Sequence, residues 1–220
     1  MSRIIKAVVF DLDGTLLNTI EDIADANNQM LSKNALPTHT LDKYIQWIGN
    51  GAKQLVEKSL PANSGLDIDL CVQEYEQFYE KNSCNKSCLY EGIAEVLDYL
   101  VDNDIKITIN TNKPQHLTNV VQAYYLNKWP FEVVIGKSKK FLHKPDPSGA
   151  LYIREQLNID PAHILFIGDS DVDMNTAKNA QMIPLGVTWG YGHPEAVVDG
   201  NNLIDQVSQI IDFVKQSNCK

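Results

Sequence analysis

The chain reads Val-Val-Phe-Asp-Leu-Asp-Gly-Thr over residues 8–15, and this stretch decides the fold. An apolar, β-branched run ends in two carboxylates and a glycine, which is typical of a buried strand followed by a sharp turn. Residues two apart on a strand point to the same side, so Asp11 and Asp13 are expected to present their carboxylates together. Because open α/β sheets bind ligands at the carboxyl ends of their strands, this pair predicts a functional site there.

Further apolar segments share the character of this first strand. They are rich in β-branched residues and bounded by polar residues, and such continuous apolarity is typical of strands covered by helices on both faces. Together with the first, the expected strands are Ile4–Phe10, Ile105–Asn110, Phe131–Ile135, Ile164–Ile167 and Ile183–Val187. Helical periodicity lies between them, so the sequence predicts an α/β fold with a doubly wound, Rossmann-like parallel sheet.

One stretch breaks this alternation of strands and helices. Residues 18–87 are almost entirely helical in pattern, with polar turns near Pro37, Gly49 and Gly65. We therefore expect a helical cap inserted after the first strand, with residues 1–17 and 88–220 forming the α/β core. In a chain of 220 residues, this insertion accounts for the length beyond one ordinary domain.

A second acidic cluster, Gly-Asp-Ser-Asp-Val-Asp, occupies residues 168–173 directly after a predicted strand. Asp169 lies at the strand end, and Asp173 follows about one helical turn later, so both can face one site. Asp171 is expected to point elsewhere or to cap the following helix, because acidic residues are common in a first helical turn.

Groups that suit a phosphate lie between the two acidic clusters. Thr111 and Asn112 follow a predicted strand and precede a helix, whose first N–H groups can bind an anion. A Thr-Asn pair at a strand end is equally an ordinary turn. Lys144 opens the segment Lys-Pro-Asp-Pro, whose prolines restrict its backbone, and Asp146 and Pro147 are expected to begin the next helix with Pro147 at its first position.

Charge repulsion at this sheet edge indicates the class of ligand. Four carboxylates would crowd together without a cation, and they belong to Asp11, Asp13, Asp169 and Asp173. Ligands that are all oxygen favour Mg²⁺ over zinc, so a magnesium ion is expected among them. Lys144 and Thr111 would remain to hold an anionic oxygen group, and a phosphate monoester fits this arrangement better than a neutral substrate.

Composition excludes several classes of protein. Nineteen Lys and Arg against 28 Asp and Glu give a net charge of −9, which disfavours binding to nucleic acid or to an anionic membrane. The longest early apolar run is too short for a signal peptide or a membrane span, so a cytoplasmic location is expected. No disulfide scaffold or zinc pattern is recognisable, so free thiols are expected at Cys71, Cys84, Cys88 and Cys219.

In order along the chain, these motifs resemble the four motifs of the haloacid dehalogenase-like hydrolase superfamily. The resemblance implies that Asp11 is a nucleophile and Asp13 a general acid and base. It implies phosphate contacts from Thr111, with Asn112 beside it, and from Lys144. The helical insertion resembles the C1-type cap of this superfamily.

The same resemblance implies how the Mg²⁺ ion is held. Its ligands would come from Asp11, from the backbone carbonyl of Asp13 and from Asp169, while Asp173 would support them from behind. Within the superfamily, residues 47–51, 144–147 and 186–192 look like the phosphoglycolate phosphatase branch. The turn of Gly49, Asn50 and Gly51 would then be the substrate loop of the cap.

The function that this resemblance implies is a Mg²⁺-dependent phosphatase acting on a small phosphate monoester, foremost 2-phosphoglycolate, through an aspartyl-phosphate. A pyrophosphatase, a nucleotide or sugar phosphatase and a phosphomutase such as β-phosphoglucomutase are alternatives with similar motifs. A receiver-type signalling domain also combines an Asp cluster with Thr and Lys, but the helical insertion and the motif order count against it. The expected partner is a small phosphorylated metabolite, and the expected state is a monomer or homodimer.

Overall fold

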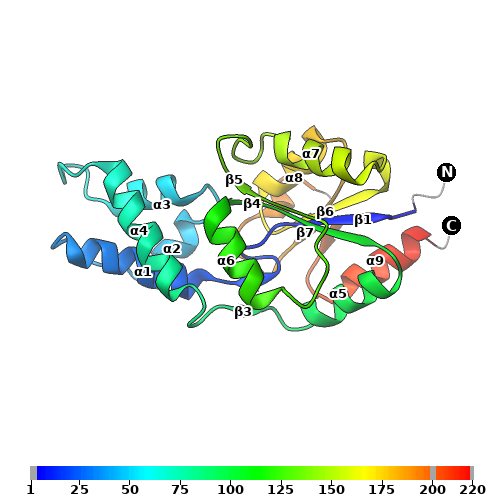
Figure 1. Cartoon of the computed structure of the whole chain (residues 1–220), viewed down its shortest axis with the longest axis horizontal. Helices are drawn as coiled ribbons and strands as arrows, with labels where there is room; N and C mark the ends of the chain where they lie inside the picture. Colours follow the sequence, from blue (N-terminus) through cyan, green and yellow to red (C-terminus); the bar gives the residue numbers. More distant parts are fainter. Residues whose placement is uncertain (1–3, 199–201, 219–220) are drawn as a thin grey trace.

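The computed structural model describes residues 4–198 and 202–218. A six-stranded sheet runs through it in the order β5-β4-β1-β6-β7-β8, with every neighbouring pair parallel. The strands are β1 (Ala7–Phe10), β4 (Lys106–Pro114), β5 (Val133–Lys137), β6 (Ile164–Gly168), β7 (Ile183–Val187) and β8 (Leu203–Ile204). Helices cover both faces of the sheet (Figure 1), so the predicted α/β class with a doubly wound, Rossmann-like parallel sheet is confirmed.

Strand β1 lies in the middle of the sheet, and its successive side chains enter two different cores. Val8 and Phe10 pack into the core shared with α5, α6 and α9, whereas Ala7 and Val9 pack into the core shared with α7 and α8. Burial on both faces explains why the strand is continuously apolar rather than alternating. These helices are α5 (Ile93–Asp102), α6 (Gln115–Tyr125), α7 (Ser148–Leu157), α8 (Asp171–Asn179) and α9 (Gln209–Asn218).

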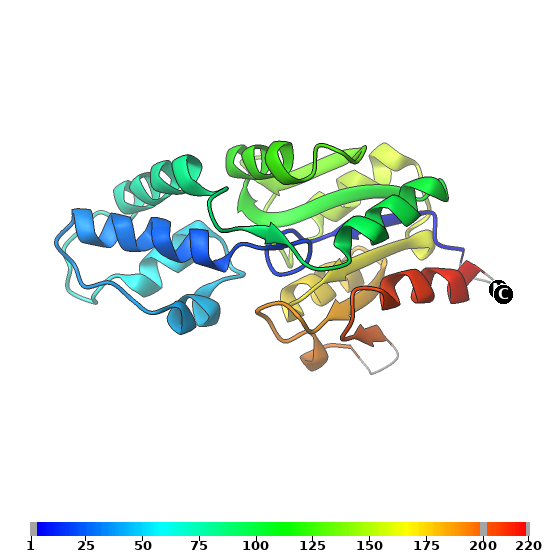
Figure 2. The same cartoon turned by 90° about the horizontal axis from the view of Figure 1, so that it is seen from below.

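Four helices within residues 20–82 form a separate group at one end of the molecule (Figures 1 and 2). They are α1 (Ile20–Lys33), α2 (Leu41–Trp47), α3 (Ala52–Ser59) and α4 (Ile68–Asn82). Short antiparallel strands, β2 (Leu17–Asn18) and β3 (Cys88–Leu89), carry the chain into this group and back. Asp22 links the two connections between the helical group α1–α4 and the rest of the chain. Its buried carboxylate accepts hydrogen bonds from the N–H (2.8 Å) and the hydroxyl (2.6 Å) of Ser87.

Several local expectations differ from the structure. Strand β1 begins at Ala7 rather than Ile4, and β5 lies two residues later than the expected range 131–135. Residues 111–114 belong to β4 rather than to a turn, because the strand continues past an irregularity in its pairing with β5. Helix α7 begins at Ser148, so Pro147 lies at the N-cap and not at the first helical position. Asp146 still supports this helix start, since its carboxylate accepts a hydrogen bond from the N–H of Ser148 (2.9 Å).

Two expectations from composition can be compared with the described part of the chain. None of the helices in residues 4–198 and 202–218 combines the length and the apolarity needed to cross a membrane. Cys71, Cys84 and Cys88 are free thiols, as expected. Cys219 lies outside the described residues.

Candidate active site

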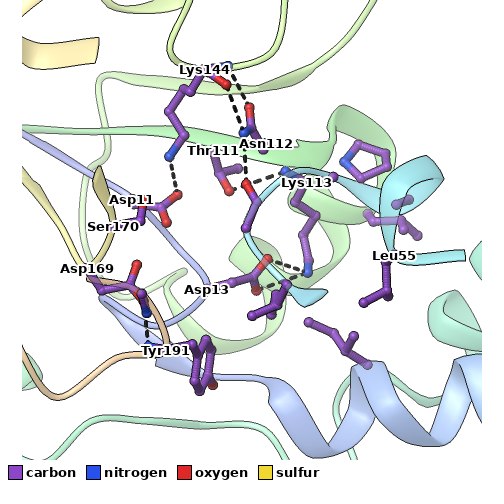
Figure 3. A pocket seen from close by; sticks show the side chains of 18 of the residues that line it. Asp11, Asp13, Leu55, Thr111, Asn112, Lys113, Lys144, Asp169, Ser170 and Tyr191 are labelled. Carbon is purple, nitrogen blue, oxygen red and sulfur yellow. Dashed lines mark hydrogen bonds and ion pairs between the residues drawn. The ribbon is translucent and has the colours of Figure 1, made fainter. Parts of the chain in front are cut away.

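The carboxyl ends of β1, β4 and β6 meet at the edge of the sheet that faces helices α1–α4 (Figure 1). Because β1 lies between the other two strands, Asp11 is flanked by Thr111 from β4 and by Asp169 after β6. These three residues line a cavity of about 70 Å³ (Figure 3). Its apolar wall is formed by Ile23, Ile48, Leu55, Tyr75 and Leu117.

Three buried carboxylates form the acidic group of this cavity. One oxygen each from Asp11, Asp169 and Asp173 lies within 4.8 Å of the other two. The expected crowd of four carboxylates is thus a group of three, because the side chain of Asp13 is paired with a lysine elsewhere in the cavity. Burial raises the pKa of both Asp11 and Asp169. Without a bound cation, full ionisation of the three carboxylates is therefore disfavoured.

Lys144 is the counter-ion of this acidic group. Its Nζ donates to Oδ1 of Asp11 (2.7 Å) and to Oδ1 of Asp173 (2.5 Å), and its side chain is only 4% exposed. Burial works to lower the pKa of Lys144, but the two carboxylates outweigh it and raise the pKa above its ordinary value. Lys144 therefore carries a positive charge at neutral pH.

Asp169 is fixed by the loop that follows β7. Its Oδ2 accepts hydrogen bonds from the N–H groups of Tyr191 (2.7 Å) and Gly192 (3.1 Å). Across residues 4–198 and 202–218, no protein donor contacts Oδ1 of Asp169 or Oδ2 of Asp11. Two carboxylate oxygens are thus left for a cation, and donors that are all oxygen fit a hard divalent ion.

The start of helix α8 places Asp173. Ser170 is the N-cap of this helix: its hydroxyl accepts from the N–H of Asp173 (3.3 Å), and Oδ2 of Asp173 accepts from the N–H of Ser170 (3.2 Å). Asp171, the alternative cap, is the first helical residue and is exposed. This reciprocal capping holds Asp173 with its second oxygen directed at Lys144.

Asp13 has a different set of partners. Nζ of Lys113 lies 3.0 Å and 2.9 Å from its two oxygens (Figure 3). The hydroxyl of Thr19 donates to Oδ1 of Asp13 (2.7 Å). The Lys113 side chain is 4% exposed, and its Nζ lies 4.4 Å from the centre of the Tyr79 ring on α4. The sequence motifs did not single out Lys113, although it lies two residues beyond Thr111 on an extended strand and therefore on the same side.

The two predicted phosphate contacts on β4 are placed differently. Thr111 lines the cavity, and its hydroxyl accepts a hydrogen bond from the N–H of Lys113 (3.3 Å). The side chain of Asn112 forms a bridge: Nδ2 donates to the carbonyl groups of Gly49 (3.0 Å) and Lys144 (3.3 Å), and Oδ1 accepts from the N–H of Lys144 (2.7 Å). The side-chain amide of Asn112 therefore connects the sheet to the group of helices α1–α4. Only the main chain of Asn112 is then left for a contact with phosphate.

The predicted substrate loop of the cap reaches the cavity through its glycines. Gly49 and Gly51 line the cavity, whereas Asn50 between them is exposed. Gly51 has φ +85°, and a Cβ at this position would overlap the ring of His143. Only glycine permits this approach of the helical group to the segment that carries Lys144.

Comparisons with known proteins agree with this geometry. Residues 8–187 match the family described as haloacid dehalogenase-like hydrolase. The chain is 33% identical over 221 positions to a phosphoglycolate phosphatase of Photobacterium profundum, covering 96% of each protein. It is 32% identical over 210 positions to a phosphoglycolate phosphatase of Mannheimia succiniciproducens, covering 91% of this chain and 93% of that protein.

The fold also has similar counterparts among solved structures. A crystal structure described as a predicted phosphoglycolate phosphatase from Haemophilus somnus 129pt superimposes with a TM-score of 0.86 at 28% sequence identity. The superposition covers 96% of this chain and 98% of that one. Since the family match spans most of the chain and includes the strands that carry the cavity, this protein belongs to the haloacid dehalogenase-like hydrolase family.

Proposed function

We propose that this protein is a Mg²⁺-dependent phosphatase that hydrolyses a small phosphate monoester, with 2-phosphoglycolate as its substrate. The observation that carries the proposal is Asp11: a buried carboxylate with one oxygen on Lys144 and the other without a protein donor in the described residues. The relatives named phosphoglycolate phosphatase support this choice of substrate. A cavity of about 70 Å³ is far below the ~300–1,000 Å³ of drug-sized sites, which favours a few-atom ester over a nucleotide.

The residues present fit a Mg²⁺ ion. Asp11 and Asp169 would hold it through their free oxygens, together with the main-chain carbonyl of Asp13, while Asp173 supports the group through Lys144. When bound, the ion would neutralise the acidic group and offset the repulsion between Asp11 and an incoming phosphate.

In the first step, a carboxylate oxygen of Asp11 attacks phosphorus and the bond from phosphorus to the ester oxygen breaks. Asp13 gives a proton to the departing alkoxide, so an alcohol leaves and an aspartyl-phosphate forms on Asp11. Lys144 and Thr111 stabilise the negative charge that gathers on the phosphoryl oxygens.

In the second step, water attacks the phosphorus of the aspartyl-phosphate. Asp13, which lost its proton in the first step, takes a proton from this water, and inorganic phosphate leaves as Asp11 is regenerated. Asp13 lines the cavity beside Asp11, where the hydroxyl of Thr19 holds it without a direct bond to Lys144, and this position supports its use in both steps.

We infer that helices α1–α4, within the expected cap of residues 18–87, act as a cover over this cavity. Ile48, Leu55 and Tyr75 supply its apolar wall from that side, and the hydrogen bond from Asn112 to Gly49 closes its rim. A cover of this kind excludes water from the phosphorylated Asp11 until the alcohol has left.

The proposal predicts that Asp11→Asn removes phosphate release. The amide cannot attack phosphorus, so kcat should fall by about 10⁴-fold or more. Phosphate release with Mg²⁺ should be compared over 2-phosphoglycolate, pyrophosphate, nucleotides and sugar phosphates by kcat/KM. Asp171→Asn is the matched control, because Asp171 is exposed on α8. Near-normal turnover of the best ester by Asp11→Asn would refute the role of Asp11 as nucleophile.

A further inference from the structure

One cation in the cavity, Lys113, has no contact with Asp11 or Asp173 among the described residues. Lys144 is engaged by Asp11 and Asp173, whereas Lys113 lies against Asp13. Each of the two acids that end β1 therefore has its own lysine, and Figure 3 shows the two lysines entering the cavity from different sides. A cavity with two separate cations suits a substrate with two separate anionic groups.

The position of Lys113 indicates which part of the substrate it faces. Asp13 donates its proton to the ester oxygen, so the groups around Asp13 lie beside the leaving alcohol. The helices add only apolar and aromatic surface there, from Ile23, Leu55 and Tyr75. Among the described lining residues, Lys113 is the single positive side chain on this side of the cavity.

We propose that Lys113 is a specificity residue that binds an anionic group on the leaving alcohol of the substrate. The inference rests on the proposed phosphatase function and adds the class of ester: one whose alcohol carries a carboxylate next to the ester carbon. In 2-phosphoglycolate, a single carbon separates the carboxylate from the ester oxygen. Asp11 and Lys113 both line the same cavity, so an ester with two close anionic groups can present one to each of them.

The contacts of Asp13 allow Lys113 to exchange partners. Thr19 donates to Oδ1 of Asp13 (2.7 Å) from the start of α1, so the carboxylate stays in place when the ammonium of Lys113 turns to a substrate anion. Oδ2 of Asp13 is then released toward the ester oxygen. The face of the Tyr79 ring, 4.4 Å from Nζ, keeps the charge of Lys113 in this buried position during the exchange.

Burial makes this recognition selective. The ammonium of Lys113 is withdrawn from water, so a carboxylate that reaches it forms a strong charge-assisted hydrogen bond. A neutral alcohol of the same size has no anionic group that could replace Asp13 as the partner of Lys113, so Lys113 stays paired with Asp13. The ester with the anionic alcohol is therefore bound in preference to its neutral counterpart.

The experiment uses two esters of matched size, 2-phosphoglycolate and 2-hydroxyethyl phosphate, with Mg²⁺ present. For the wild-type protein, kcat/KM should favour 2-phosphoglycolate. Lys113→Met should lower kcat/KM for 2-phosphoglycolate about 100-fold, mainly through KM, and for the neutral ester only a few-fold. Lys113→Arg should keep most of the preference. Lys53→Met is the control, because Lys53 is exposed on α3 and paired with Asp69.

Lys113→Gln covers the case in which Lys113→Met does not fold, since glutamine still donates a hydrogen bond to Asp13 but carries no charge. It should lose the preference in the same way. Equal losses on both esters in the folded variants would overturn the inference, because they would show that Lys113 acts only through Asp13. Equal kcat/KM of the wild type on both esters would also overturn it, while the proposed phosphatase would stand.

Failure of the proposed function gives a different result. If the wild-type protein releases no phosphate from any ester, calorimetric binding of the same two esters replaces turnover. Tighter binding of 2-phosphoglycolate that Lys113→Met abolishes would support the inference about Lys113 without phosphatase activity. Equal binding of the two esters to the wild type would overturn it.

Discussion

At the scale of single residues, two carboxylates separated by one position have different surroundings. Asp11 shares Lys144 with Asp173 and faces the acidic group, whereas Asp13 is held by Thr19 and Lys113. Pairs of acids whose environments differ in this way commonly divide nucleophilic and proton-transfer work between them. The roles proposed for Asp11 and Asp13 therefore follow from their partners as well as from their positions.

Asp13→Asn should lower kcat for 2-phosphoglycolate by about 10²–10⁴-fold, because the alcohol leaves only with a proton. For 4-nitrophenyl phosphate, the loss in the rate of the first step should be smaller, since an aryl oxide can leave without a proton. Pre-steady-state release of the alcohol from both esters measures the difference. The control is Asp42→Asn, on an exposed residue of α2. An equal loss of the first step on the alkyl and aryl esters would rule out the acid role.

The sequence was sufficient to bring Asp11, Thr111 and Asp169 to one cavity, because each follows a strand and parallel strands end at the same edge. It was not sufficient for the contacts of Lys113. Its contact with the Tyr79 ring depends on the packing of α4 against the core and not on any local pattern. The bridging side chain of Asn112 depends in the same way on where Gly49 lies.

At the scale of elements, helix α1 is capped by a residue from the other end of the chain. The hydroxyl of its N-cap residue, Thr19, is occupied by Asp13, so it does not cap the helix. The hydroxyl of Tyr191 takes its place: it accepts from the N–H groups of Thr19 (2.8 Å) and Ile20 (3.2 Å) and donates to Asn18 (2.7 Å). The loop after β7 thus supports both α1 and the acidic group.

Tyr191→Phe should lower the free energy of unfolding by about 1 kcal/mol, the usual cost of losing a helix cap. The backbone N–H that holds Asp169 is kept, so the expected change is in stability and not in the acidic group. Urea unfolding followed by circular dichroism measures it, with Tyr124→Phe as the exposed control. Unchanged stability relative to the wild type would contradict the capping role.

The predictability of the elements depended on their length. Strands β1, β6 and β7 could be predicted because four or five consecutive residues, most of them buried, leave a visible apolar run. Strand β5 is less buried, and its predicted range was displaced by two residues. The strands β2, β3 and β8 have two residues each, which is too few for any pattern. Their pairing is decided by the tertiary fold, as is the extension of β4 through residues 111–114.

At the scale of the whole molecule, the acidic group makes stability depend on pH and on metal. Burial raises the pKa of Asp11 to about 7 and that of Asp169 to about 8, whereas an unfolded Asp has a pKa of about 3.9. The metal-free folded protein therefore binds protons that the unfolded chain has released. Its free energy of unfolding should fall as pH rises from about 4 through these raised values.

Mg²⁺ should accordingly stabilise the protein more at high pH. At pH 8.5 the ion meets ionised carboxylates, whereas at pH 5.5 it competes with protons for the same oxygens. Thermal unfolding with 5 mM Mg²⁺ or with EDTA, at both pH values, measures the difference in Tm. The rise caused by Mg²⁺ should be larger at pH 8.5 and should shrink in Asp169→Asn. An equal rise at both pH values would contradict the raised carboxyl pKa values.

The antiparallel pair of β2 and β3 has a consequence for replacing the helical segment between these strands. Asn18 and Cys88 oppose each other in an antiparallel pair, so the two ends of the helical segment emerge side by side. Two antiparallel strands can be closed by a tight turn of two residues, or opened to accept an insert of any length whose ends are equally close. The helical segment between β2 and β3 can therefore be replaced by another helical segment without changing the order of strands in the large sheet.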